Sequence, residues 1–338
     1  MFKASTALAT IVATTLTTAA WAEGEVNLYS SRHYDTDERL YSDFEEATGI
    51  TINRIEGKAD ELIARMSAEG ANSPADILLT VDTSRLERAK DAGVLQSIDS
   101  EVLEARVPAY LQDSDNQWFG FSQRGRVIFY DKNDVDNPPR TYLDLADPQY
   151  AGKVCIRSSS NTYNQTLLAS IIEHHGEEAA LAWADGVVAN MARAPKGGDT
   201  DQLRGLVSGE CEIAVGNTYY FARALRKNVK GVSDDIDMIG WIFPSQDAEG
   251  AHMNLSGGGV AAHAPNKENA IKFLEYLASD QAQQYFSGGN DEYPAVPGVG
   301  LSDTVAKLGH FKPDDVSLSA VAKNIPTAQK IFDEAGWR

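Results

Sequence analysis

The chain has 338 residues, with 30 Lys and Arg side chains against 49 Asp and Glu, and a formal net charge of −19 at pH 7. This excess of acid argues against binding to nucleic acid or to anionic membrane surfaces, because both need basic patches. The length is sufficient for two domains.

The N-terminus reads as a secretory signal peptide. Lys3 is followed by an apolar stretch from Ala7 to Ala20, and Ala20-Trp21-Ala22 fits a small-x-small cleavage site. No later segment approaches about 18 consecutive apolar residues, the length of a membrane-spanning helix. We therefore expect cleavage after Ala22 and an exported protein that is not embedded in a membrane.

The first block after this peptide alternates strands and helices. The expected strands cover residues 26–30, 50–55 and 75–80, and the expected helices cover residues 36–48, 59–69 and 84–92. Each helix places its apolar residues on one face and is followed by a glycine. Such alternation predicts a parallel sheet with helices on both faces.

A long strand at residues 120–132 leads into a second alternating block. Further strands are expected at residues 152–158, 211–217, 235–244 and 256–264. Helices are expected at residues 164–174, 177–191, 200–208, 220–227, 267–278 and 280–286, followed by a Pro- and Gly-rich turn at 288–300 and a helical C-terminus.

Two α/β blocks joined by long strands predict a two-lobed clamp with its ligand cleft between the lobes. We expect an N-terminal lobe of residues 23–120 plus 247–300 and a C-terminal lobe of residues 121–246 plus 301–338.

The only two cysteines, Cys155 and Cys211, each lie near the start of an expected strand. In an oxidising compartment they could form one disulfide if the two strands are neighbours. Two buried free thiols are the alternative, and the sequence leaves this choice open. Metal binding by two lone cysteines is not expected.

Side chains with ligand chemistry follow three of the expected strands. His33 and Tyr34 come after the first strand, Tyr163 after the strand at 152–158, and Tyr219 and Tyr220 after the strand at 211–217. A single Tyr at such a place is usually a packing residue. Five such groups at three strand ends instead suggest a binding site, with the Tyr219-Tyr220 pair expected on the turn between strand and helix.

One histidine and several tyrosines best suit ferric iron. A highly charged cation lowers the pKa of a coordinated phenol, and phenolate is a known protein ligand of iron. Calcium and magnesium prefer carboxylates and carbonyls, while zinc and copper would need more His or Cys. The sequence does not decide whether Fe²⁺ is also bound.

Four phenolates around Fe³⁺ would leave one negative charge, which burial would penalise. An arginine close to the site would offset it. Candidates are Arg32, Arg124, Arg126 and Arg223, of which Arg223 lies one helical turn beyond Tyr219.

These residues resemble a known family. VNLYSSRHYDTDERLYSDFEEATGI, EGKADELIARMSAEG followed by SPADILLT, SSNTYNQ, GNTYYFARAL and GGNDEYPAV are similar to segments of bacterial periplasmic ferric-iron-binding proteins of ABC importers. These belong to the family 1 extracellular solute-binding proteins, and the FutA-type branch is most similar. The resemblance covers nearly the whole chain after the signal peptide.

The resemblance implies a type II periplasmic binding protein fold with hinge strands, and it implies that iron is the transported ligand. It implies five iron ligands, with two arginines balancing charge behind them: His33, Tyr34, Tyr163, Tyr219 and Tyr220, then Arg124 and Arg223. Another branch of the family uses a glutamate and a synergistic anion, and here no obligatory anion is expected. Glu56 and Glu61 remain minor candidates.

The resemblance also implies a monomer in the periplasm that delivers iron to a membrane permease and its ATPase. A binding protein of the same fold for a non-metal solute, such as a polyamine, thiamine or an oxyanion, is the first alternative. A secreted enzyme is the second, but the sequence has no nucleophile elbow, no HExxH and no Ser or Cys paired with a His at a strand end.

Overall fold

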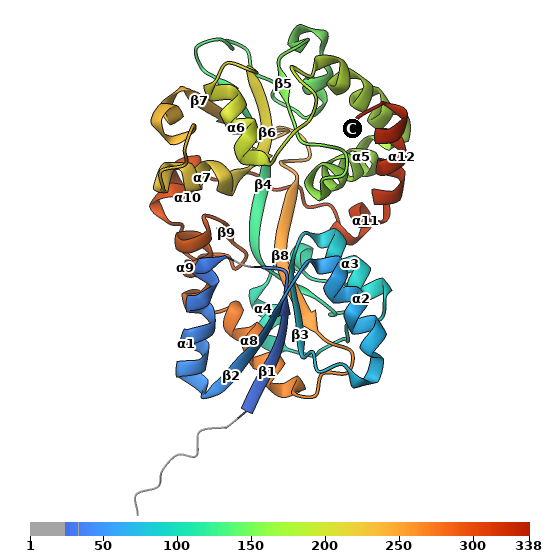
Figure 1. The fold of residues 1–338 in the computed structure, drawn as a ribbon, viewed down its shortest axis with the longest axis vertical. Coiled ribbons are helices and arrows are strands. Elements are labelled where there is room, and N and C mark those ends of the chain that lie inside the picture. The colour runs from blue at the N-terminus through green and yellow to red at the C-terminus, as the bar shows by residue number, and fades with distance from the viewer. Residues whose placement is uncertain (1–23, 33) are drawn as a thin grey trace, which may run out of the picture.

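The computed structural model describes residues 24–32 and 34–338. The expected signal peptide and His33 lie outside these residues. The described chain forms two α/β lobes, one above the other in Figure 1, with two long strands running between them. The two-lobed α/β architecture predicted from the sequence is confirmed, while the exact lobe boundaries stay a prediction.

The N-terminal lobe follows the expected alternation closely. Its first elements are β1 (Gly24–Ser30), α1 (Glu38–Thr48), β2 (Ile50–Glu56), α2 (Ala59–Glu69), β3 (Ile77–Val81) and α3 (Thr83–Asp91). Strand β1 pairs in parallel with both β2 and β3. A short helix, α4 (Glu101–Arg106), was not anticipated. The C-terminal segment returns to this lobe with β8 (Met253–Val260), which pairs antiparallel with β3, and with α8 (Lys267–Leu277) and α9 (Asp280–Asn290).

Strand β4 (Phe119–Asp131) belongs to both lobes. Residues 119–125 pair with β8, whereas residues 126–131 pair with β6 (Ile213–Asn217) and β7 (Ile239–Ile242). The exchange of partners falls between Gly125 and Arg126. Figure 1 shows β4 and β8 running side by side from one lobe to the other, so these strands form the hinge.

The C-terminal lobe contains β5 (Val154–Cys155), α5 (Thr162–Asn190), α6 (Asp199–Val207), β6, α7 (Thr218–Arg226) and α12 (Ile325–Glu334), with α10 (Asp303–Leu308) and α11 (Leu318–Lys323) beside them. The two helices expected at 164–191 are one element interrupted at Gly176, which has a φ of 82°. A left-handed φ suits glycine and breaks the helical hydrogen bonding there.

Two expected strands are shorter than predicted. Only Val154 and Cys155 of residues 152–158 form a strand, and residues 235–238 belong to a 3₁₀ helix (Ser233–Met238) that precedes β7. In this segment Asp234, Asp235 and Asp237 are all exposed, so it lacks the alternation of buried and exposed residues that is typical of a strand. The apolar alternation that suggested a strand therefore holds only from Ile239 onward.

The two cysteines form a disulfide. Cys155 on β5 and Cys211, just before β6, have Cα atoms 5.8 Å apart, because β5 and β6 are parallel neighbours. Gly205 on α6 packs directly over the bridge, where a Cβ would lie 2.7 Å from Cys211 Sγ. The choice left open by the sequence is thus resolved in favour of the disulfide.

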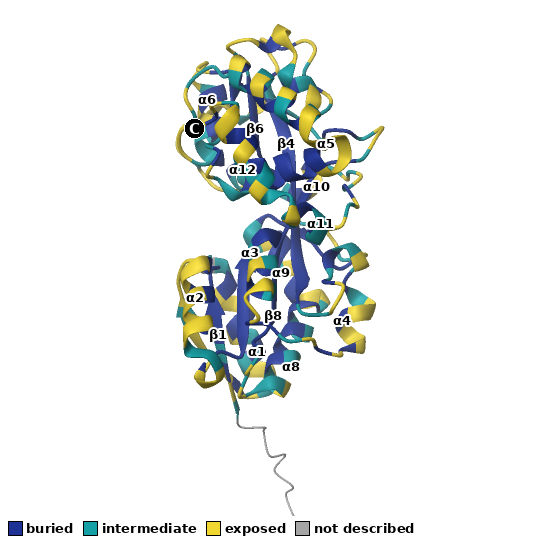
Figure 2. Cartoon of the chain, turned by 90° about the vertical axis from the view of Figure 1, so that its right-hand side faces the viewer, coloured by how far each residue is buried: buried dark blue, intermediate teal, exposed yellow. Residues whose placement is uncertain are grey.

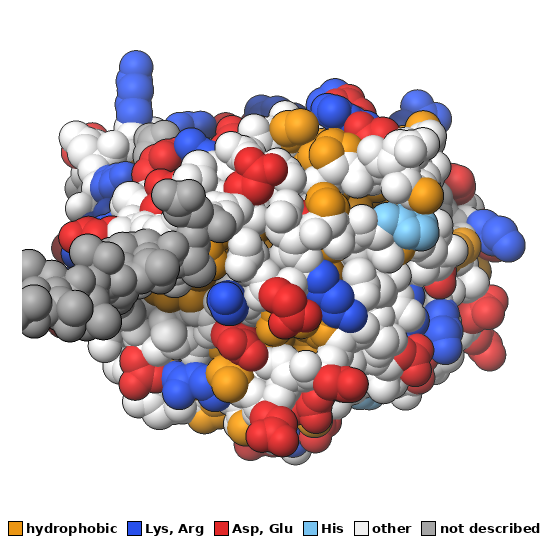
Figure 3. All heavy atoms as spheres, turned by 90° about the horizontal axis from the view of Figure 1, so that it is seen from below, with side chains coloured by type: hydrophobic (Ala, Val, Ile, Leu, Met, Phe, Trp, Pro, Cys, Tyr) orange, Lys and Arg blue, Asp and Glu red, His pale blue; other side chains and the backbone are white. Residues whose placement is uncertain are grey.

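Each lobe has its own buried core. One apolar cluster fills the N-terminal lobe, and two others cover the two faces of the C-terminal sheet. Figure 2 shows buried strands inside and helices exposed on their outer faces. Acidic and basic side chains are interspersed on the face seen in Figure 3. Within residues 24–32 and 34–338, no helix has the length and apolar character needed to cross a membrane.

Candidate metal centre

The four tyrosines singled out in the sequence all stand where a strand leads into a helix. Tyr34 follows β1 and directly precedes a 3₁₀ turn (Asp35–Asp37), and Tyr163 lies in the first turn of α5. Tyr219 and Tyr220 lie in the first turn of α7. The expectation that this pair occupies the turn before the helix was wrong, because α7 begins at Thr218.

Local capping explains where these helices start. Asn161 is the N-cap of α5, and its Oδ1 accepts a hydrogen bond from the backbone N–H of Tyr163 at 3.2 Å. Asn217 precedes α7 in extended conformation, and its backbone N–H donates to the buried Asp199 at 2.8 Å. Both tyrosine-bearing helix ends are therefore fixed by hydrogen bonds next to the site.

The tyrosines come together in one cleft. The hydroxyl oxygens of Tyr163 and Tyr219 are 3.4 Å apart, and the ring centroids of Tyr219 and Tyr220 are 4.2 Å apart. Tyr34, Tyr163, Tyr219 and Tyr220 all border a cavity of about 740 Å³. Its other lining residues come from both lobes: Ser31, Glu56, Gly57, Lys58, Ala59, Asp60, Glu61, Val81, Arg85 and Arg223.

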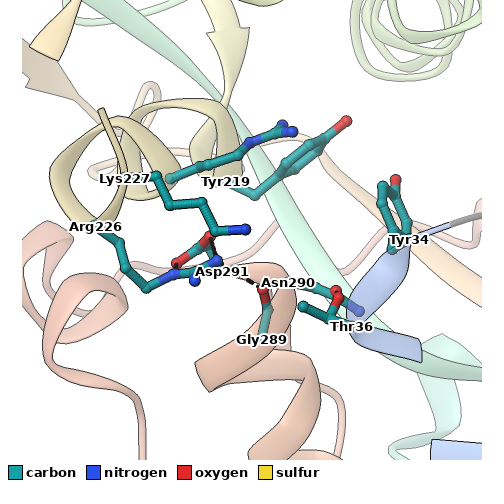
Figure 4. Close-up of a pocket in the computed structure, with 9 residues that line it drawn as sticks. Tyr34, Thr36, Tyr219, Arg226, Lys227, Gly289, Asn290 and Asp291 are labelled. Atoms are coloured by element: carbon teal, nitrogen blue, oxygen red, sulfur yellow. Dashed lines mark hydrogen bonds and ion pairs between the residues drawn. The ribbon is translucent and has the colours of Figure 1, made fainter. Parts of the chain in front are cut away.

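A smaller cavity of about 190 Å³ adjoins the cleft between Tyr34 and Tyr219. Figure 4 shows these two side chains on opposite sides of it, with their hydroxyl groups at the same end. The rest of its wall comes from α7 and the end of α9: Arg223, Arg226, Lys227, Gly289, Asn290, Asp291 and, after β1, Thr36.

The two arginines expected behind the tyrosines lie close to them but differ in their partners. Arg223 Cζ is 5.5 Å from the Tyr219 ring centroid and 5.0 Å from that of Tyr220. Arg223 forms no ion pair with any carboxylate that the structure describes. Arg124 Cζ is 6.0 Å from the Tyr219 ring, but its Nη1 donates to Glu292 Oε1 at 2.8 Å.

Two buried carboxylates near the tyrosines were missed by sequence reasoning. Glu292 binds Arg124 and lies 3.5 Å from Arg32, while Asp199 binds Arg126 at 2.8 Å and lies 3.4 Å from Arg157. Glu292 is part of the GGNDEYPAV segment, but nothing in that segment reveals that its carboxylate is buried. Asp199 is the first residue of α6, an ordinary amphipathic helix, and gives no sequence signal.

Burial disfavours the ionised form of three of these phenols. Desolvation raises the pKa of Tyr219 well above its ordinary value, and the neighbouring tyrosines raise it further. Desolvation also raises the pKa of Tyr220 and of Tyr34, and the charges of Asp199 and Glu292 respectively add to this. Burial alone would lower the pKa of Arg124, but Glu292 and the nearby tyrosines raise it above its usual value.

Other metal-binding side chains do not gather elsewhere in the part of the chain that is described. Three or more His, Cys, Asp or Glu side chains nowhere come together there in a way that could hold a metal ion. Glu56 and Glu61 line the cleft, but their side chains are 44% and 65% exposed and pair with Arg54 and Lys58. Because both carboxylates are exposed and paired with other side chains, the tyrosines remain the candidate ligands.

Comparison with known proteins places this site in context. Residues 72–314 match the family model described as bacterial extracellular solute-binding protein. The chain is 50% identical to iron uptake protein A1 of Synechocystis over 93% of its own length and 88% of that protein. It is 27% identical to an Fe(3+)-binding periplasmic protein of Serratia marcescens, over 94% of this chain and 92% of that one.

A solved structure is equally similar. The Trichodesmium protein IdiA (FutA), in complex with iron and citrate ligands, superposes with a TM-score of 0.89 at 50% identity, covering 93% of this chain and all of that one. The likeness therefore extends over both lobes.

Proposed function

Because the chain belongs to the family of bacterial extracellular solute-binding proteins, we propose that it captures ferric iron in the cleft between its lobes and passes it to an ABC importer. Relatives and a structural neighbour at 50% identity are named for iron uptake or contain iron. The proposal rests most directly on one observation, the convergence of four tyrosines from three separate segments on one cleft.

The proposed ligands are the four clustered tyrosines with His33 as the fifth. Tyr34 comes from the N-terminal lobe, whereas Tyr163, Tyr219 and Tyr220 come from the C-terminal lobe. Closure about β4 and β8 would bring Tyr34 toward the other three and bury the ion. The two lobes thus each supply part of the coordination sphere.

The chemistry of binding follows from the burial of the phenols. In the metal-free protein the raised pKa values keep Tyr34, Tyr219 and Tyr220 neutral at pH 7. Fe³⁺ supplies the charge that lets them ionise, so binding releases protons, and acid opposes it. Arg223 offsets the negative charge left when four phenolates surround a trivalent ion.

The same proposal covers the protein's place in the cell. We assign it to the periplasm, as an exported monomer that docks on a permease and its ATPase, and we assign it no enzymatic activity. The periplasmic assignment is supported by the Serratia relative, which is an Fe(3+)-binding periplasmic protein. The alternative, a non-metal solute in the same cleft, would leave the phenols as hydrogen-bonding groups only.

A spectroscopic titration decides between these functions. Purified protein, stripped of metal at low pH with citrate, is titrated with ferric citrate near pH 7. Iron binding by phenolates gives a visible charge-transfer band that saturates at one equivalent and bleaches with dithionite. Saturable binding of spermidine, thiamine or phosphate without such a band would favour the alternative and contradict the proposal.

A further inference from the structure

Glu292 is a buried carboxylate that joins two arginines behind the tyrosine cluster. It lies between α9 and β9 (Tyr293–Pro294) and is 1% exposed. Its Oε1 accepts a hydrogen bond from Arg124 Nη1 at 2.8 Å, and its Oε2 accepts one from Ser122 Oγ at 2.7 Å. Arg32 Nη1 lies 3.5 Å from Oε2. One side chain thus connects the segment after β1 with the hinge strand β4.

Each of these arginines faces a proposed ligand. Arg32 Cζ lies 4.9 Å from the ring centroid of Tyr34, and Arg124 Cζ lies 6.0 Å from that of Tyr219. Glu292 therefore contacts Tyr34 through Arg32, and Tyr219 through Arg124. Without its carboxylate both guanidinium groups would lose a buried partner, and their positions against the rings would no longer be fixed.

The guanidinium group of Arg124 is held in one position by several hydrogen bonds. Besides Glu292, its guanidinium donates to Ser256 Oγ at 2.7 Å and to the backbone oxygen of Leu255 at 2.7 Å. Arg32 is held in the same manner, since its Nε and Nη2 both donate to Asp37 at 3.0 Å. Both guanidinium groups are thus held by several hydrogen bonds each.

The charges within this network cancel. Arg32 and Arg124 carry two positive charges, and Glu292 and Asp37 carry two negative charges. Arg124 is therefore not a free counter-charge for an ion held by the tyrosines. Arg223 is such a free counter-charge, because it lies against Tyr219 and Tyr220 and pairs with no described carboxylate.

We propose that Glu292 is a positioning residue of the iron site, which holds Arg32 and Arg124 against Tyr34 and Tyr219 and cancels their charge, and thereby sets the preference for ferric over ferrous iron. This inference rests on the function proposed above. One more negative charge close to the metal stabilises the trivalent ion more than the divalent one. A site that lost Glu292 would consequently hold Fe³⁺ less selectively.

The test is Glu292→Gln, which keeps the shape of the side chain and removes its charge. The ferric charge-transfer band is followed during a mediated redox titration, which gives the ratio of ferric to ferrous affinity. The ratio should fall on the order of tenfold, which is the effect of one unit charge about 12 Å from the metal at an effective dielectric constant of about 20.

Arg124→Gln should change the ratio of ferric to ferrous affinity in the opposite direction. It removes a positive charge and should therefore raise this ratio. The double variant restores neutrality and should return the ratio to within about twofold of the wild type. If Glu292→Gln alone does not fold, these two variants still decide the question.

Asp113→Asn is the matched control, since Asp113 is a buried carboxylate whose partner Lys90 lies outside the cleft lining. This variant should leave the ratio of ferric to ferrous affinity unchanged.

Each result has one meaning. A wild-type ratio in Glu292→Gln, or a double variant that does not recover, overturns the role of Glu292 while leaving iron capture intact. A wild-type protein with no ferric charge-transfer band overturns the proposed function and this inference with it.

Discussion

Tyr163 and Tyr219 lie on different helices, 56 residues apart in the chain, and their hydroxyl oxygens are only 3.4 Å apart. Two phenolates at that distance would repel each other. A trivalent cation between them removes this repulsion.

Replacing Tyr219 and Tyr220 together by Phe should abolish the ferric charge-transfer band. It should also reduce ferric affinity on the order of a hundredfold or more, because two anionic ligands are lost. Visible absorption and competition with citrate measure both effects. Tyr276→Phe is the control, since the Tyr276 hydroxyl is buried without a hydrogen-bond partner and lies outside the cleft lining. An unchanged band in the double variant would rule out these residues as ligands.

Arg223→Gln should shift iron release toward higher pH. The variant loses the one arginine against Tyr219 and Tyr220 that no described carboxylate neutralises, so protons compete more effectively for the phenolates. The midpoint of colour loss in an acid titration measures the shift. Arg39→Gln, which removes an arginine stacked on Tyr285, should leave the midpoint in place. A midpoint equal to that of wild type would argue against Arg223 as the counter-charge.

His252 should make the metal-free protein sensitive to acid. Its ring is 2% exposed, neither ring nitrogen has a hydrogen-bond partner among the described residues, and burial lowers its pKa to about 4. Asp314 and Asp82 oppose this shift, while Arg126 and His174 favour it. The folded state binds the proton less readily than the unfolded state, so stability present above pH 6.5 is lost as pH falls toward 4, by roughly 3 kcal/mol.

Urea unfolding at pH 7 and at pH 4 tests this prediction. The loss of unfolding free energy between the two pH values should be smaller in His252→Gln than in the wild type. His310→Gln, at an exposed position, serves as the control and should behave as wild type. Equal losses in all three proteins would contradict the role given to His252.

Loss of the disulfide should destabilise the C-terminal lobe without changing the site. Cys155 and Cys211 are separated by 56 residues, and closing a loop of that length contributes about 4 kcal/mol in the chain-entropy account. The Cys155→Ala/Cys211→Ala variant should therefore unfold at lower urea concentration, yet bind ferric iron with wild-type stoichiometry. Dithiothreitol should lower the stability of the wild type but not that of the variant.

Gly205→Ala gives a second test of this packing. A Cβ there would lie 2.7 Å from Cys211 Sγ and 3.1 Å from Cys155 Sγ, so the variant should be less stable while the disulfide is intact. In the background that lacks both cysteines the same substitution should cost much less. An equal cost in both backgrounds would mean that the crowding does not involve the sulfur atoms.

The sequence by itself determined the alternation of strands and helices and the positions of the four tyrosines at strand ends. Both depend on local periodicity and on capping residues such as Asn161, and such signals can be recognised from a few neighbouring positions in the sequence. It did not determine whether residues 235–238 are extended, because a short apolar pattern fits a strand and a 3₁₀ turn equally well.

Only the tertiary structure decided which charges are free. Arg124 and Arg223 looked equivalent in the sequence, but Arg124 is paired with Glu292 from a segment 168 residues away, whereas Arg223 has no described carboxylate partner. The disulfide likewise depends on β5 and β6 being neighbours. Pairing of this kind arises where distant parts of the chain meet, and electrostatic energy depends on those distances rather than on residue order.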